Sequence, residues 1–158
     1  MDDRELDNAV KTLTIIWGTM VLSVLIYMFV IPRFIGESIN IDLPPDVYQI
    51  LRAALYIVSF GLILGARVVS KLMLSGKTNF SQTTSNISNP VIGRYTTAMI
   101  MALALSEAIG IFGLVLFLIA KDTMNLYFLG VVSILSMFMY RPSREDIVDA
   151  ATKQETRH

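Results

Sequence analysis

The sequence of 158 residues contains no cysteine and only one histidine, His158, which is the last residue. Without cysteine the chain has no disulfide framework, no thiolate nucleophile and no thiolate metal site. The single terminal histidine makes a zinc site or a histidine-based catalytic triad improbable. The sequence also lacks a Walker loop, a GxGxxG run and a cluster of carboxylates. We therefore expect no metal, no cofactor and no enzymatic activity of the chain by itself.

Charged residues are also scarce. They make up 16% of the chain, and the 13 basic residues balance the 13 acidic ones, so nothing in the charge favours nucleic acid as a partner. In contrast, 54% of the residues are hydrophobic and the mean hydropathy is +0.59. This surplus exceeds the usual balance of a soluble globular domain. The lipid bilayer is therefore the expected surrounding of the chain.

Stretches with little or no charge predict the membrane-spanning elements. A helix of about 20 apolar residues spans the hydrocarbon core at a rise of about 1.5 Å per residue. The first stretch precedes Arg33 and lacks a cleavage site of small residues, so we interpret it as a retained anchor rather than a signal peptide. The second spans the core only if Arg52 and Arg67 extend their side chains toward the two interfaces. The prediction is an all-α integral membrane protein with one domain, 1–158, and four transmembrane helices, at about 12–32, 48–72, 95–120 and 123–140.

Polar segments and the distribution of basic residues predict the orientation. Residues 75–89 are rich in Ser, Thr and Asn and predict a solvated loop, and residues 141–158 are charged and predict a solvated tail rather than a short surface helix. With four spans, ten Lys and Arg residues fall on the side of the termini and three on the other side. Cytoplasmic flanks retain positive charge. We expect both termini, the loop and the tail to be cytoplasmic, in the inner membrane of a bacterium.

Glu107 is the residue that points to chemistry. It lies 13 residues after Arg94 and 14 before Lys121, so about 20 Å of helix separates it from either end of its span. An ionised carboxylate at the bilayer midplane costs about 2.5 kcal/mol or more, so we expect Glu107 to be neutral at rest. A neutral carboxyl group can release and rebind a proton. The alternative is a protonated glutamate that only forms a hydrogen bond to a neighbouring helix.

Small residues near Glu107 predict where another helix approaches. Small side chains at four-residue spacing let two backbones come close within a membrane. If the second and third helices form a hairpin aligned at Lys71 and Arg94, Ser59 lies level with Glu107 and is its expected hydrogen-bond partner, with Ser106 as further support. The residues expected at helix contacts are Gly61, Gly65, Ala102, Gly110 and Gly113.

The run from Asn89 to Ile119, NPVIGRYTTAMIMALALSEAIGIFGLVLFLI, resembles the second helix of the proteolipid subunit c of F-type ATP synthases. In that family a polar cytoplasmic loop with a proline leads through an arginine into a helix whose midplane carboxylate binds the transported proton. Pro90, Arg94 and Glu107 occupy the corresponding places. Ala108 follows Glu107 where sodium-binding members tend to have a hydroxyl residue, so the resemblance implies proton binding. It covers 31 residues well and extends weakly through the second helix.

Two functions from different classes follow. In the first, the chain is a subunit-c-like proteolipid in which Glu107 binds and releases a proton, within a homo-oligomer or together with other membrane subunits. In the second, the chain is a structural or assembly subunit and Glu107 serves packing. The second is favoured by glycine content, because subunit c has a dense GxGxGxG run where this chain has only Gly61 and Gly65. A channel or secondary transporter is a third candidate, but inverted repeats and broken helices are missing from the pattern.

Overall fold

The structure, a computed structural model, describes residues 3–35, 43–74 and 90–155. Within these ranges every regular element is an α-helix. The helices are α1 (Asp3–Phe29), α2 (Ile31–Ile35), α3 (Pro45–Leu74), α4 (Pro90–Ala120), α5 (Thr123–Phe138) and α6 (Arg144–Glu155).

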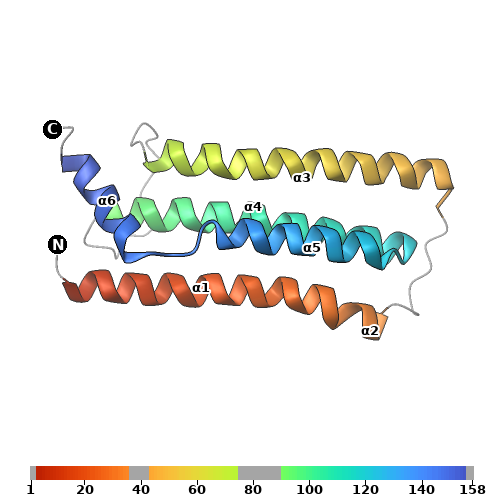
Figure 1. Ribbon diagram of the computed structural model, residues 1–158, viewed down its shortest axis with the longest axis horizontal. Coiled ribbons are helices and arrows are strands. Elements are labelled where there is room, and N and C mark those ends of the chain that lie inside the picture. Colours follow the sequence, from red (N-terminus) through yellow and green to blue (C-terminus); the bar gives the residue numbers. More distant parts are fainter. Residues whose placement is uncertain (1–2, 36–42, 75–89, 156–158) are drawn as a thin grey trace.

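The four longer helices lie side by side, with α4 and α5 between α1 and α3 (Figure 1). Helices α1 and α4 run in one direction and α3 and α5 in the other, so the two termini lie at the same end of the bundle. Helix α4 packs against α1, α3 and α5 and also touches α6. It is therefore the central helix, and its side chains have helical neighbours on several sides.

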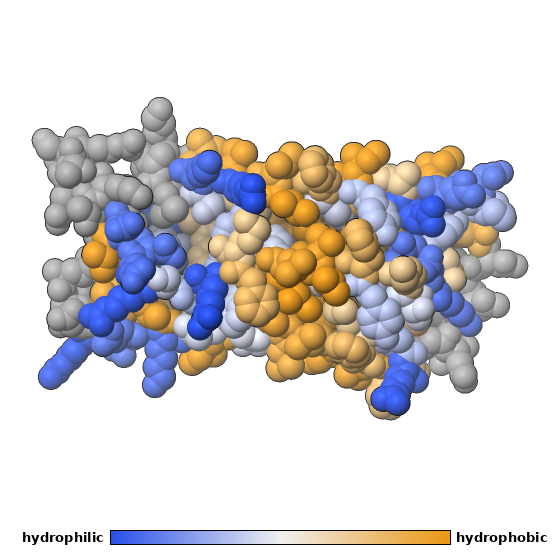
Figure 2. Space-filling view, in the orientation of Figure 1, coloured by the Kyte–Doolittle hydropathy of each residue, from blue (hydrophilic) through white to orange (hydrophobic). Residues whose placement is uncertain are grey.

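Three of the described helices are long and apolar enough to cross a membrane, over Leu6–Phe34, Pro45–Leu72 and Ile92–Ala120. In the most apolar window of the third, 44% of the residues are buried, against 11% in each of the other two, which agrees with the central position of α4. Hydrophobic residues form a band across the middle of the surface in Figure 2, and hydrophilic residues gather toward both ends. A surface of this kind is suited to a bilayer. The expectation of an all-helical fold is confirmed for the described residues, and three of the helices could span a membrane.

Helix α5 is shorter than the predicted fourth span. It has 16 residues and ends at Phe138, with a turn at Met139 and Tyr140. At a rise of about 1.5 Å per residue it is about 24 Å long, somewhat less than the hydrocarbon thickness of about 30 Å. Length and composition therefore establish three candidate spans, and α5 is an apolar helix that packs alongside them.

The termini contain more helix than the charge pattern predicted. Helix α1 begins at Asp3 rather than near residue 12, because Leu6 and Leu13 are buried and form an apolar stripe with Ala9 and Val10. An apolar stripe at this spacing is what packs a helix onto its neighbours. The membrane-like composition of 12–32 thus marks only part of a longer helix.

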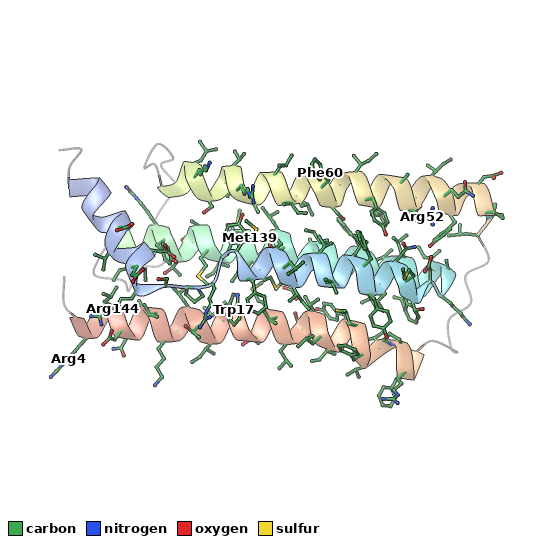
Figure 3. The ribbon with its side chains drawn as sticks, viewed as in Figure 1. Arg4, Trp17, Arg52, Phe60, Met139 and Arg144 are labelled. Atoms are coloured by element: carbon green, nitrogen blue, oxygen red, sulfur yellow. The ribbon has the colours of Figure 1, made fainter. Side chains whose placement is uncertain are left out.

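The expectation of a solvated tail over 141–158 also differs from the structure, which has α6 at Arg144–Glu155. Ile147 is fully buried in the same cluster as Leu6 and Ile92, so one apolar side chain docks the helix on α1 and α4. Arg144 adds an exposed ion pair with Asp7, 3.4 Å apart, and lies near the start of α1 (Figure 3). In the sequence this docking is indicated only by one isoleucine within a charged segment, which is a weak signal.

A two-residue turn connects α4 to α5 and sets how the two helices pair. Lys121 adopts a left-handed backbone conformation with φ of 55°, and Asp122 caps α5 by accepting hydrogen bonds from the backbone amides of Met124 and Asn125. Polar side chains also attach α3 at this end, because Tyr48 donates to Asp122 and Tyr56 donates to Asn125. The end of the bundle opposite the termini is therefore held by a network of side-chain hydrogen bonds.

Candidate functional site

The Glu107 carboxyl group lies between α4 and α1. Its side chain is half-buried, and one oxygen, Oε1, accepts hydrogen bonds from two hydroxyl groups of α1. The Oγ atom of Ser23 is 2.5 Å from Oε1 and the phenolic oxygen of Tyr27 is 3.4 Å from it. Among the described residues no cation forms an ion pair with this carboxylate. The site is thus a carboxyl group that accepts hydrogen bonds from two neutral donors.

The helical repeat explains why both donors come from α1. Residues four apart lie on the same face of a helix, so Ser23 and Tyr27 point toward α4 together. Between them in sequence, Val24 is completely buried and packs against Gly110, where an added Cβ atom would lie 3.2 Å from Cγ1 of Val24. Gly110 follows Glu107 by three residues and lies on a nearby part of the α4 surface. The close approach of α1 at Gly110 therefore holds the two hydroxyl groups beside the carboxyl group.

Serine side chains connect α4 to α5 directly beside the site. Ser106 donates to the backbone carbonyl of Ala102, and its Oγ atom is 2.8 Å from Oγ of Ser136. Ser133 donates to the backbone carbonyl of Ser106 over 2.7 Å. All three serines are buried. We call this group, Ser106, Ser133 and Ser136, the serine clasp. It fixes α4 against α5, while Glu107, the residue after Ser106, faces α1.

The expected partner Ser59 does not hold Glu107 in the structure. Ser59 is buried and donates to the carbonyl of Leu55 in its own helix, while the hydrogen bonds to Glu107 come from Ser23 and Tyr27. Ser106, the other expected support, takes part in the serine clasp. The correction has a simple cause, since the alignment considered only the α3–α4 hairpin whereas the carboxyl group lies on the side of α4 that faces α1.

The expected packing residues fall into two groups. Ala102 is fully buried, Gly110 packs against Val24 and Ser133, and an added Cβ atom at Gly113 would lie 3.0 Å from Cβ of Leu129. Gly110 and Gly113 therefore lie where α4 meets its neighbours α1 and α5. An added Cβ atom at Gly61 or Gly65 would meet nothing within 4 Å. The GxxxG pair of α3 therefore makes no close helix approach within the described part of the chain, contrary to the expectation.

Ser23 and Tyr27 are the site residues that sequence reasoning missed. A signal for them existed, because α1 and α4 run in the same direction and Ser23 follows Lys11 by 12 residues much as Glu107 follows Arg94 by 13. At equal rise per residue these positions lie at about the same depth. Two polar side chains four residues apart within an apolar helix mark one polar face. Recognising the partner required knowing that α1, and not only α3, packs on α4.

Comparison of the chain with protein-family models, curated proteins and solved structures found no match. Its chemistry must therefore be argued from the site. In the ranges that the structure describes, no group of three or more His, Cys, Asp or Glu side chains is placed to hold a metal ion. The site offers one exchangeable carboxyl proton and two hydroxyl groups, which is a set suited to holding and releasing a proton.

Proposed function

We propose that this chain is a membrane subunit in which Glu107 binds and releases a proton within a larger membrane assembly. The observation that supports this most is the hydrogen bonding of Glu107. Its carboxyl group lies about midway along the central apolar helix, half-buried, and is hydrogen-bonded by Ser23 and Tyr27, and no basic residue of the described ranges forms an ion pair with it. A carboxylate in such surroundings is costly and is a candidate functional group by default. The resemblance of residues 89–119 to subunit c agrees with the same role.

The assembly is part of the proposal because the described chain provides only this one carboxyl group at that depth. Within the candidate spans, Asp46 lies in the first turn of α3 and Asp7 near the start of α1, far along the helices from the level of Glu107. A relay across a membrane requires several exchangeable groups. Neighbouring copies or other membrane subunits would supply the remaining groups.

The basic residues at the two ends of the bundle support an orientation in the membrane. Within the described ranges, Arg33, Arg52 and Lys121 belong to the end opposite the termini, while the end with the termini has more Lys and Arg. We propose that the termini face the cytoplasm, that α5 completes a four-helix membrane domain with α1, α3 and α4, and that the protein resides in a bacterial cell membrane.

Carbodiimide labelling tests the function. A hydrophobic carbodiimide reacts with protonated carboxyl groups in apolar surroundings, so we expect it to modify Glu107 selectively, with labelling that fades as the pH rises. Peptide mapping by mass spectrometry locates the adduct, and native mass spectrometry sizes the labelled assembly. Asp122, which caps α5 at the end of the bundle, is an internal control that should stay unlabelled. Absence of labelling at Glu107 at every pH would contradict the proposal.

A structural or assembly subunit is the second candidate, and the serine clasp favours it. The clasp and the contacts of Gly110 and Gly113 show that polar and small residues of α4 serve packing. Glu107→Gln separates the candidates because glutamine keeps an acceptor for Ser23 and Tyr27 but carries no exchangeable carboxyl proton. A packing role predicts an active assembly with glutamine, and a proton-binding role predicts loss of activity that Glu107→Asp partly restores.

A further inference from the structure

The hydroxyl group of Ser23 lies between two acceptors. Its Oγ atom is 2.7 Å from the backbone carbonyl oxygen of Met20 and 2.5 Å from Oε1 of Glu107. A serine hydroxyl has one hydrogen and two acceptor lone pairs. It can therefore donate to only one of the two oxygens at a time. When it donates to the Met20 carbonyl, its contact with Glu107 is a hydrogen bond only if the carboxyl group is the donor.

The charge of Glu107 decides which arrangement forms. An ionised carboxylate only accepts, so Ser23 and Tyr27 must both donate to it, and hydrogen bonds to an ionised acceptor are about twice as strong as neutral ones. A protonated carboxyl group can donate, so it gives its hydrogen to Ser23, which then gives its own to Met20. Resting on the function proposed above, we infer that Ser23 reverses its hydrogen bond when Glu107 changes charge, and that Ser23 and Tyr27 together set how firmly Glu107 holds its proton.

The two hydroxyl groups have different parts in this arrangement. Ser23 has a hydrogen-bonding role in both charge states, so neither state leaves a polar group without a partner in apolar surroundings. Tyr27 contributes as a donor, at the longer distance of 3.4 Å, and serves mainly the charged state. Because its contact with Oε1 is much shorter, 2.5 Å against 3.4 Å, Ser23 is the stronger determinant of proton affinity and Tyr27 the weaker one.

Other titratable groups on the helices around α4 make their contacts elsewhere. On α3, Arg67 donates to Sδ of Met139. Arg52 interacts electrostatically with Tyr48 and Tyr56, the two tyrosines of the network at the end of the bundle. On α5, Asp122 accepts hydrogen bonds in that same network and Tyr127 contacts the ring of Phe29. In the described part of the chain, Tyr27 is the titratable side chain that faces Glu107 from a packed helix.

The test compares the pH midpoint of carbodiimide labelling at Glu107 in variants of the full-length protein. Ser23→Ala removes a hydrogen-bond donor to the charged form of Glu107. The labelling midpoint should therefore rise by about one pH unit, which corresponds to an acid dissociation constant about tenfold smaller. Tyr27→Phe should raise it by less, and Ser23→Thr, which keeps a hydroxyl group, should restore the wild-type midpoint.

Matched controls lie on α1 and α5. Thr19 of α1 donates to the carbonyl of Ile15 and Tyr127 of α5 contacts Phe29, so Thr19→Ala and Tyr127→Phe remove similar groups without touching Glu107. A wild-type midpoint in Ser23→Ala and Tyr27→Phe, equal to that of these controls, would overturn the inference and leave the proposed function standing. A Glu107 that shows no pH-dependent labelling in the wild type would overturn both.

Discussion

Replacing Gly113 by alanine should loosen the contact between α4 and α5. The added Cβ atom would lie 3.0 Å from Cβ of Leu129 and 3.2 Å from the backbone carbonyl oxygen of Leu126. A backbone carbonyl within a helix cannot rotate away as the end of a side chain can, so the two helices must separate slightly. Overpacking of this kind costs about 1–3 kcal/mol.

Gly61 provides the matched control on another helix. An added Cβ atom there meets nothing within 4 Å, so Gly61→Ala keeps the packing and gains helix propensity, up to about 1 kcal/mol. The same propensity gain offsets part of the cost at Gly113. We therefore expect Gly113→Ala to be less stable than Gly61→Ala by about 1–3 kcal/mol, since the propensity gain is common to both and cancels.

Reversible unfolding in mixed detergent micelles, followed by far-ultraviolet circular dichroism, measures this difference. Gly130→Ala adds a further case, because its Cβ atom would overlap the side chain of buried Met28, so that side chain rather than a backbone must shift. If Gly113→Ala and Gly61→Ala unfold at the same denaturant concentration, the close approach of α4 and α5 is refuted. If Gly61→Ala lowered the stability of the isolated chain, the conclusion that α3 is open at Gly61 would be refuted.

Three further predictions concern the clasp, the turn and the orientation. Ser133→Ala removes the hydrogen bond to the carbonyl of Ser106 and should cost about 0.6 kcal/mol and at most about 1.7 kcal/mol in the same unfolding assay, and a larger loss would point to a cavity instead. Asp122→Ala removes the cap of α5 and should cost about 0.5–2 kcal/mol, whereas an unchanged midpoint would show that the cap contributes nothing. Because the chain has no native cysteine, Lys71→Cys and Lys121→Cys each introduce a unique thiol, and an impermeant maleimide should reach the first from the cytoplasm and the second from the opposite side. Labelling of both from one side would contradict the orientation.

The parts of the fold that sequence predicted well are those determined by long-range composition. Uncharged stretches located the apolar helices, because the bilayer requires an uninterrupted apolar length whatever the neighbouring helices are. The ends were less well predicted, because there a few buried side chains decide. Leu6 extends α1 to Asp3 and Ile147 docks α6, and neither residue stands out in a charged segment.

The candidate site was predicted in its central residue and not in its partners. Glu107 stands out because a charge within an apolar helix is costly, which is a property of one residue and its own helix. The partners depend on which helices pack together and on their rotation about their axes. Aligning α3 with α4 pointed to Ser59, whereas the packing of Val24 on Gly110 brings Ser23 and Tyr27 of α1 to the carboxyl group. The same rotation leaves Gly61 and Gly65 away from α4, so the spacing of small residues was insufficient to predict their contact.

Infrared difference spectroscopy between acidic and alkaline pH tests the central claim most directly, because it detects the C=O stretch of a protonated carboxyl group. With the protein in lipid bilayers, we expect a carboxyl band that disappears as the pH rises and that is absent from Glu107→Gln at every pH. Ser23→Ala should retain the band and change the pH at which it disappears. A band that Glu107→Gln leaves unchanged, or no pH-dependent carboxyl band in the wild type, would contradict proton binding at Glu107.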